Sequence, residues 1–361
     1  MRALSNLKPL QQKGFSLIEL MIGMVLGLLI MGAVISVALS SLKTYRTTKA
    51  VNEIHDNARY AFEFVGRDIR EAGFTPCGND IDVANVLLNY SDNNANTSEL
   101  DWWGDMSVVS GLASGDYSAA DWVGTDMAVP WNGSPVLRLQ TIDGAVYTVV
   151  DHSPPTAATM ELSPHDIDDG DILLVCDYES AAIFQANVNG SDKILHPANK
   201  GSGAASLVPG NCSKGLGYKP ACKEDADDAN GKIKSFEGGQ IVRLQPKIWY
   251  VGCNGRPKSS PDCSVPEGRS IFFTKWDPSD EYSNGDSRSP GLKSIELVSG
   301  VKSMGISYRE SSGAGNYVSA PSNWDDVNAI KLNLELENSS AGVGGVSRSF
   351  EAVFALRNRL L

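Results

Sequence analysis

The hydrophobic positions divide the chain into a helical N-terminal part and a strand-rich remainder. Residues 20–39 carry no charged side chain, and twenty such residues can cross a bilayer as a helix. Further on, apolar residues recur at amphipathic-helix spacing, with charged residues such as Asp68 on the other faces: Val51, Ile54, Ala58, Phe62, Val65 and Ile69. No proline interrupts the chain between Pro9 and Pro76. We therefore expect one helix over residues 15–72.

Alternation of apolar and polar residues predicts strands in the rest of the chain. It is clearest near the C-terminus, at residues 330–336 and 350–356. Further strand candidates are residues 136–140, 145–150, 172–176, 182–188, 240–251, 270–276, 294–298 and 304–309. Polar, glycine-rich stretches separate them, and several of these stretches are too long for simple hairpin turns.

These patterns indicate an α+β fold in which a long N-terminal helix packs on a β-rich head. The chain begins with a basic leader at residues 1–14. A membrane-spanning helix at residues 15–42 and its amphipathic continuation at residues 43–73 follow. The C-terminal head then occupies residues 74–361. We interpret residues of about 200–265, which contain four of the six cysteines, as an insertion in that head.

The leader contains Arg2, Lys8 and Lys13 and no acidic residue. By the positive-inside rule, the N-terminus stays in the cytoplasm and the remainder is exported. A cleaved secretory signal peptide or a plain signal anchor would share this feature, although the apolar run is longer than a typical signal-peptide core. Neither accounts for Glu19, because a carboxylate near the end of an apolar span is costly unless it is paired or neutralised.

The residues around Glu19 resemble those of a known family. A basic leader, then Gly14, Phe15 and the sequence SLIEL at residues 16–20, resembles the class III signal of type IV pilins and type II secretion pseudopilins. The resemblance implies a type IV pilin-like fold, cleavage between Gly14 and Phe15 by a prepilin peptidase, and N-methylation of the new Phe15 amine. It also implies that Glu19 pairs with the Phe15 ammonium of a neighbouring subunit in a filament. In a low-dielectric helix bundle, that pair would offset two desolvation penalties and fix the axial register.

Two features of the apolar helix concern its packing against other helices. Gly23 and Gly27 form a small-xxx-small pair, which lets helices approach closely and is common in apolar segments. The helix also lacks the proline found inside the helix of many major pilins, and Ser36 stands near that place.

The downstream sequence is similar to the C-terminal half of PilW-type minor pilins. The similar segments, which also suit core packing, are residues 171–175, 182–185, 297–301, 304–308, 324–332 and 356–359. The resemblance implies a minor pilin that joins other minor pilins and the major pilin in a tip or priming complex, with a PilY-type tip adhesin as a further partner. It would begin as a single-pass protein of the bacterial inner membrane, with a periplasmic head, and then reach the pilus at the cell surface. There it would support twitching motility, adhesion or DNA uptake.

Three other functions remain open on the sequence. A minor pseudopilin of a type II secretion system would share the leader, Glu19 and the helix. A membrane-anchored periplasmic hydrolase would need a catalytic constellation, and a direct adhesin would use exposed aromatic residues. The aromatic candidates for an interface, or equally for a core under a loop, are Trp102, Trp103, Tyr117, Trp122 and Trp131.

The six widely spaced cysteines suit disulfide bonds in an oxidising compartment better than a metal site. Six cysteines allow fifteen connectivities, among which we favour one set of pairs. The first pair would tie the end of the helix to a strand, and the other two, each ten residues apart, would staple their own loops: Cys77–Cys176, Cys212–Cys222 and Cys253–Cys263.

Composition and the remaining motifs argue against catalysis and nucleic-acid binding. The formal net charge is −12, and loss of the three basic leader residues would make it −15, whereas nucleic-acid binders usually present a basic face. The four histidines form no metalloprotease motif, and neither a nucleophile elbow nor a phosphate-binding loop occurs. The acidic run at residues 166–171 departs from a calcium loop in the position of Gly170 and fits a solvated turn better. We therefore expect no enzyme activity, no cofactor and no metal.

Overall fold

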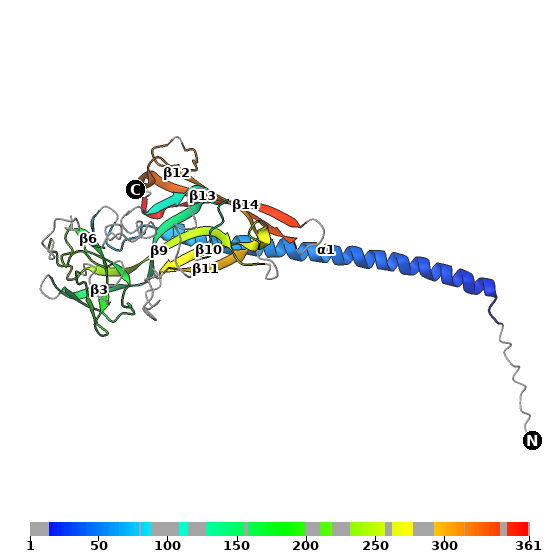
Figure 1. Cartoon of the computed structure of the whole chain (residues 1–361), viewed down its shortest axis with the longest axis horizontal. Helices are drawn as coiled ribbons and strands as arrows, with labels where there is room; N and C mark the ends of the chain where they lie inside the picture. Colours follow the sequence, from blue (N-terminus) through cyan, green and yellow to red (C-terminus); the bar gives the residue numbers. More distant parts are fainter. Residues whose placement is uncertain are drawn as a thin grey trace, which may run out of the picture. The chain divides into compact units, whose positions relative to one another are not determined.

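The computed structural model of the chain divides into two compact units (Figure 1). The first is Met1–Asn52 with Ser339–Val346, and the second is Glu53–Asn338 with Ser347–Leu361. The residues that the structure describes are 14–78, 81–87, 108–114, 128–154, 158–198, 210–218, 232–256, 262–276, 292–313, 315–339 and 345–359.

The long helix expected at residues 15–72 is present. Helix α1 (Leu17–Glu71) runs for 55 residues, which confirms the expectation to within two residues at its start and one at its end. Gly73 lies two residues after the end of the helix and has a φ of 71°, a conformation that other residues rarely adopt. The N–H of Gly73 then donates to the carbonyl of Gln140 at 2.9 Å, so the chain passes from the helix directly onto the sheet.

In the second unit, one face of α1 is buried, as the amphipathic pattern predicts. Its buried apolar residues are Ile54, Ala58, Ala61, Val65 and Ile69. The C-terminal strand β14 (Val346–Ala355) packs against this part of the helix. A Cβ added to Gly66 would lie 2.3 Å from the ring of Phe354, so the absence of a side chain lets the two elements approach. The ring centroids of His55 and Phe350 are 5.3 Å apart.

An eleven-stranded sheet forms much of the described head (Figure 1). Its strands are β1 (Asp82–Asn85), β2 (Val109–Leu112), β3 (Val136–Ser153), β4 (Thr159–Leu162), β5 (Ile172–Cys176), β6 (Ser180–Gln185), β7 (Asn187–Val188), β8 (Lys193–Leu195), β9 (Gln240–Cys253), β10 (Arg269–Trp276) and β11 (Leu292–Ser299). The main order is β1-β6-β5-β9-β3-β4-β8-β7, with β2 on β3, β10 on β9 and β11 on β10. Strands β3, β5 and β10 run antiparallel to β9, whereas β1 runs parallel to β6.

Strand β9 lies within residues 200–265, the stretch that was interpreted as an insertion. It pairs with β3, β5 and β10, and it is therefore central to the sheet. Ile241, Trp249 and Tyr250 on this strand are almost completely buried. At least residues 240–253 are thus part of the framework of the head, because removing them would separate the strands on either side.

The strand predictions were correct for the longer elements and wrong in two respects. The candidates at residues 136–140 and 145–150 form one strand, β3, with a register shift between Asp143 and Tyr147. Gly144 lies within this register shift and has a φ of 88°, a conformation that glycine adopts readily. The residues around Gly144 resemble a turn in the sequence, but in the structure they form a β-bulge within one strand. The short strands β1, β2, β4 and β8 were not predicted, since three or four residues are too few for a periodic signal.

A second, three-stranded sheet has the order β12-β13-β14. Strands β12 (Val301–Glu310) and β13 (Val327–Asn338) are antiparallel. The alternation predicted at residues 330–336 is confirmed, because Leu332, Leu334 and Leu336 are buried while Asn333 between them is exposed. Three single-turn 3₁₀ helices complete the described elements: η4 (Pro266–Gly268), η5 (Trp324–Asp326) and η7 (Arg357–Arg359).

Strand β5 lies at the centre of the core because both of its faces are covered. Leu173 and Val175 belong to one apolar cluster, which also contains Phe184 and Phe236. Ile172, Leu174 and Cys176 belong to a second cluster on the other face. The continuous apolar run ILLVC is therefore a strand buried on both sides, as its lack of polar residues indicates.

Candidate functional site

The N-terminus of α1 is closed by side chains of the predicted processing segment. The Oγ of Ser16 accepts the N–H of Ile18 at 3.3 Å, and the carboxylate of Glu19 accepts the N–H of Ser16 at 3.2 Å. This is a capping box, which satisfies two of the backbone donors left free at the start of a helix. Glu19 therefore has a local role that the sequence analysis missed, although the spacing S-x-x-E could have revealed it.

The predicted processing and packing residues are all accessible. Gly14 precedes the helix, and Phe15 exposes 87% of its surface. A Cβ added at Gly14, Gly23 or Gly27 would meet no atom within 4 Å. Among the described residues, the glycines of the apolar helix therefore have no packing partner, and their small size is available to a second helix.

The apolar part of α1 has no internal partner among the described residues. Large apolar side chains are exposed all along it, for example Leu28 at 70% and Val37 at 67%. By length and composition, α1 is also the single described helix that could cross a membrane. A helix that is apolar on every side requires an apolar environment, which a bilayer or other helices can supply. Together with the leader, this indicates membrane anchoring.

The amphipathic part of α1 is fixed to the sheet by a buried carboxylate. Asp68 lies 2.7 Å from the Nζ of Lys247 and accepts the indole N–H of Trp249 at 3.1 Å, and its side chain is 2% exposed. The sequence analysis placed Asp68 on a polar face of the helix, which is wrong. The charge is tolerated inside because two donors from β9 satisfy it.

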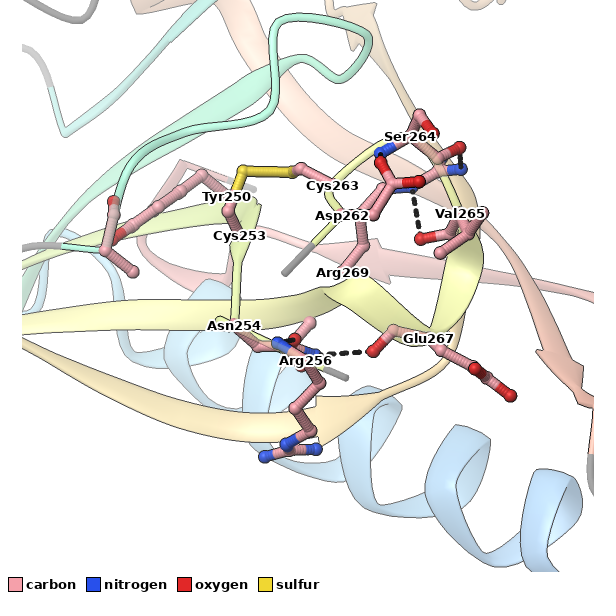
Figure 2. The surroundings of a disulfide bond; sticks show 12 residues. Tyr250, Cys253, Asn254, Arg256, Asp262, Cys263, Ser264, Val265, Glu267 and Arg269 are labelled. Atoms are coloured by element: carbon pink, nitrogen blue, oxygen red, sulfur yellow. Dashed lines mark hydrogen bonds between the residues drawn. A yellow bond between two sulfur atoms is a disulfide. The ribbon is translucent and has the colours of Figure 1, made fainter. Parts of the chain in front are cut away.

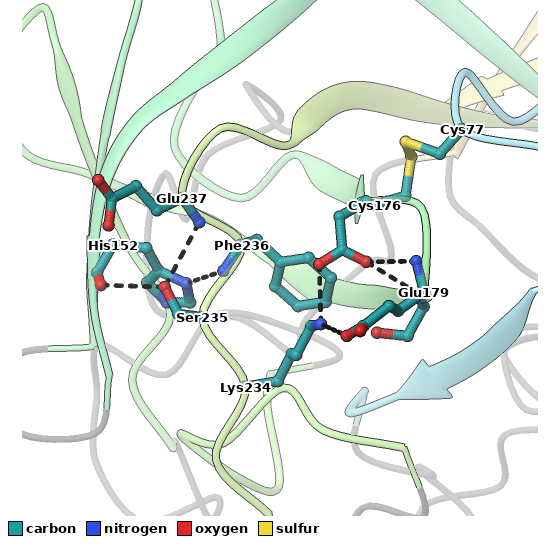
Figure 3. Close-up of polar contacts among 10 residues, drawn as sticks. Cys77, His152, Cys176, Glu179, Lys234, Ser235, Phe236 and Glu237 are labelled. Carbon is teal, nitrogen blue, oxygen red and sulfur yellow. Dashed lines mark hydrogen bonds and ion pairs between the residues drawn. A yellow bond between two sulfur atoms is a disulfide. The ribbon is translucent and has the colours of Figure 1, made fainter.

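Two of the three expected disulfide bonds lie within the described residues. Cys77, just after the helix, is bonded to Cys176 at the end of β5, and Cys253 is bonded to Cys263 (Figures 2 and 3). Cys212 is also disulfide-bonded, and its expected partner Cys222 lies outside the described residues. The first bond ties the end of α1 to the sheet, as expected.

A buried arginine, Arg269, lies near the disulfide bond between Cys253 and Cys263 (Figure 2). The guanidinium of Arg269 donates to the carbonyls of Ser264 at 2.7 Å and Lys302 at 2.8 Å. It also lies 3.9 Å from the ring centre of Trp131. Trp131, one of the aromatic interface candidates, is thus half-buried against Arg269. The other four candidates, at positions 102, 103, 117 and 122, lie outside the described residues.

The acidic run is largely the solvated turn that was expected, because Asp166, Asp168 and Asp169 are exposed, but its last residue is buried. Asp171 is 2% exposed, and one of its oxygens is 2.6 Å from the Nε of Arg243. Burial raises the pKa of Asp171, against the opposing effects of the Asp168 N–H and of Arg243. Asp166 accepts the hydroxyl of Tyr147 and also pairs with Arg243. In the described part of the chain, no three His, Cys, Asp or Glu side chains are grouped to hold a metal ion.

Comparison with known proteins identifies the N-terminal segment. Residues 10–35 match the family model of the prokaryotic N-terminal methylation motif. This supports a protein of the type IV pilin type, whose motif family is structural rather than catalytic. Neither the curated proteins nor the solved structures contain a significant match to the chain. The matched segment includes the predicted cleavage site, Glu19, Gly23 and Gly27.

Proposed function

We propose that this protein is a minor pilin that helps to start type IV pilus assembly. The observation that carries the proposal is the methylation motif at residues 10–35, because a motif of this type is found on subunits that polymerise through their N-terminal helices. The exposed apolar part of α1 is the surface that such polymerisation would cover. A prepilin peptidase would first cut between Gly14 and Phe15 and methylate the new amine.

Glu19 would then fix the axial register at which each subunit joins the filament. Its carboxylate lies in the first turn of α1, within four residues of the amine that cleavage would create. In an apolar helix bundle, an unpaired carboxylate is strongly unfavourable, whereas a carboxylate facing an ammonium of a neighbouring subunit is not. The capping bond from Ser16 uses one oxygen of Glu19, so the other remains available for this pairing.

The large head is consistent with a subunit that is present in only a few copies per filament. Residues 74–361 follow the helix, and the similarity of the C-terminal segments to PilW-type minor pilins favours the same role. We propose that the head contacts other minor pilins, the major pilin and a PilY-type tip adhesin. The protein would lie in the inner membrane with its N-terminus in the cytoplasm before it enters the pilus, and it would support twitching motility, adhesion or DNA uptake.

The alternative is a minor pseudopilin of a type II secretion system, because the motif at residues 10–35 is common to both classes. A deletion strain separates the two when surface filaments and secreted enzymes are measured together. Loss of filaments with normal secretion is expected for the proposed minor pilin. Normal filaments with enzymes retained in the periplasm would assign the protein to the secretion system instead.

A further inference from the structure

Two histidines form a buried pair in the core of the head. His152 near the end of β3 and His196 just after β8 face each other through their Nε2 atoms, which are 3.0 Å apart. His152 is 5% exposed and His196 is completely buried. The pair has no part in the processing or assembly described above.

The neighbours determine which nitrogen of each ring carries a proton. Nδ1 of His152 accepts the backbone N–H of Phe236 at 3.0 Å, so the proton of this ring is on Nε2 and is donated to His196. The proton of His196 is then on Nδ1, a buried atom that makes no hydrogen bond of standard geometry with the described residues, although the backbone of Lys214 acts on this ring. Both rings are therefore neutral. One more proton would either remove the acceptor of the Phe236 N–H or place two N–H groups against each other.

The pair holds residues 232–239, which have no regular secondary structure and lead into β9. The side chain of Phe236 is fully buried in the apolar core and stacks on His152, with ring centroids 6.3 Å apart. Figure 3 shows the same segment bound at a second point, where Lys234 lies 2.8 Å from Asp177 and 2.6 Å from Glu179. Backbone hydrogen bonds also fix the two ends of the segment, where Gly217 N–H donates to the Lys232 carbonyl at 2.8 Å and Val149 exchanges bonds of 2.9 Å with Gly238 and Gly239. Between these ends, the segment is bound by one neutral contact and one ionic contact.

Few charges of the described residues face the histidines. Burial lowers the pKa of His152 to about 4, against the opposing effect of Asp151 on the same strand. Burial, and then the neighbouring His152, lower the pKa of His196 to about 3. On the segment that covers the pair, Lys234 is neutralised by its two carboxylate partners, and Glu237 is exposed. The burial of the pair therefore dominates its protonation.

We propose that His152 and His196 form an acid-sensitive latch, and that their protonation releases residues 232–239 from the core of the head. Free histidine side chains bind a proton below a pH of about 6.5, but the closed pair excludes it. The closed state therefore binds fewer protons than the open one, so it loses stability as the pH falls below about 6.5. Release would uncover Phe236 and the apolar surface beneath it. This inference is independent of the proposed assembly role, since it concerns contacts within the head.

Hydrogen exchange of the full chain in detergent micelles, followed by mass spectrometry, measures this opening directly. Between pH 7 and pH 5, after correction for the intrinsic exchange rate, protection of residues 232–239 should fall roughly 20-fold if one histidine takes up a proton on opening, and roughly 500-fold if both do. Peptides from β13 report global unfolding and should keep their protection over the same range.

A matched double variant separates the latch from general acid denaturation. In His152→Asn/His196→Gln, the new amides can present acceptors near the original Nδ1 and Nε2 positions, but they do not titrate. Protection of residues 232–239 should then be the same at pH 7 and pH 5. An equal acid-induced loss of protection in the variant and the native chain would overturn the proposal.

A second measurement applies if the double variant does not fold. Exchange of the histidine C2 hydrogens in the native chain reports the midpoint of protonation of each ring, with the exposed His55 as a reference for the intrinsic exchange. Midpoints of His152 and His196 well below 6.5 are expected. Midpoints of both rings near 6.5 would contradict the latch.

Discussion

The two parts of helix α1 have the same backbone but require different surroundings. In the first unit, large apolar side chains such as Leu28 are mostly exposed, whereas in the second unit Ile54, Val65 and Ile69 are at most 2% exposed. The second part buries its apolar face against strands of the same chain. The first part can do so only with other molecules, which is the requirement of a subunit that is first anchored in a membrane and then polymerised.

The glycines of the helix show the same contrast on a smaller scale. Gly23 and Gly27 face open space, while the position of a Cβ at Gly66 is already occupied by Phe354. A small residue in the first part therefore leaves room for an external partner. A small residue in the second part makes room for the head of the same chain.

The largest expected effect comes from the cleavage site. Gly14→Ala should abolish processing, because the resemblance to class III signals places the cut directly after this glycine. An immunoblot of cell extracts should show only the longer precursor, whereas the matched change Gly23→Ala should leave processing unchanged. Detection of a mature-sized product from Gly14→Ala would contradict the assigned site.

Glu19→Ala should leave export and processing intact but reduce the amount of the protein in sheared filaments at least tenfold, since the ammonium of the neighbouring subunit loses its partner. Ser16→Ala is the matched control. It removes the other half of the capping box, which stabilises a helix by about 1 kcal/mol, and leaves the carboxylate in place. Equal losses in the two variants would assign the effect to the cap and not to the pairing.

Within the head, Asp68→Ala should lower the free energy of unfolding by about 3–5 kcal/mol, because it leaves Lys247 without its carboxylate in a mostly buried position. The double variant Asp68→Ala/Lys247→Met should recover part of this loss, since it removes both charges. Denaturant unfolding of the full chain in detergent would measure both effects. If the double variant is no more stable than Asp68→Ala, the ionic contact is not the cause.

The smallest expected effect is on stability, and it distinguishes Gly66, which contacts the head, from Gly27 in the apolar part of the helix. Gly66→Ala should destabilise the head by about 1–3 kcal/mol, because the new methyl group overlaps Phe354. Gly27→Ala should leave the unfolding of the head unchanged. A shorter side chain opposite the new methyl group, in Gly66→Ala/Phe354→Leu, should relieve part of the strain. Equal stability of the two single variants would show that the helix and β14 separate easily.

Local patterns predicted the part of the fold that depends on neighbouring residues. The period of apolar residues predicted α1 to within two residues, and strict alternation predicted β13. The long strands were found because each contains enough residues to show a period. The bulge at Gly144 was not predicted, since the residues that continue β3 beyond it resemble a turn followed by a new strand.

Contacts between distant residues could not be predicted in this way. Asp68 and Lys247 are 179 positions apart. Asp68 follows Val65 by three residues and Ala61 by seven, a spacing that places it on the apolar face of the helix, but this pattern does not reveal its partner on β9. The same holds for His152 and His196, which the sequence presents as two isolated histidines. Two of the predicted disulfide bonds, Cys77–Cys176 and Cys253–Cys263, are an exception, because oxidised cysteines must find partners and six cysteines allow only fifteen sets of pairs.

The bond between Cys77 and Cys176 has a mechanical consequence. Cys77 lies six residues after the end of α1, and Cys176 ends a strand that pairs with β9. Tension applied along the helix therefore reaches the central strands through a covalent link. The residues between the two cysteines are closed into one covalent loop, which includes strand β3. A pull on the helix cannot unravel that loop without first breaking either the bond or the sheet.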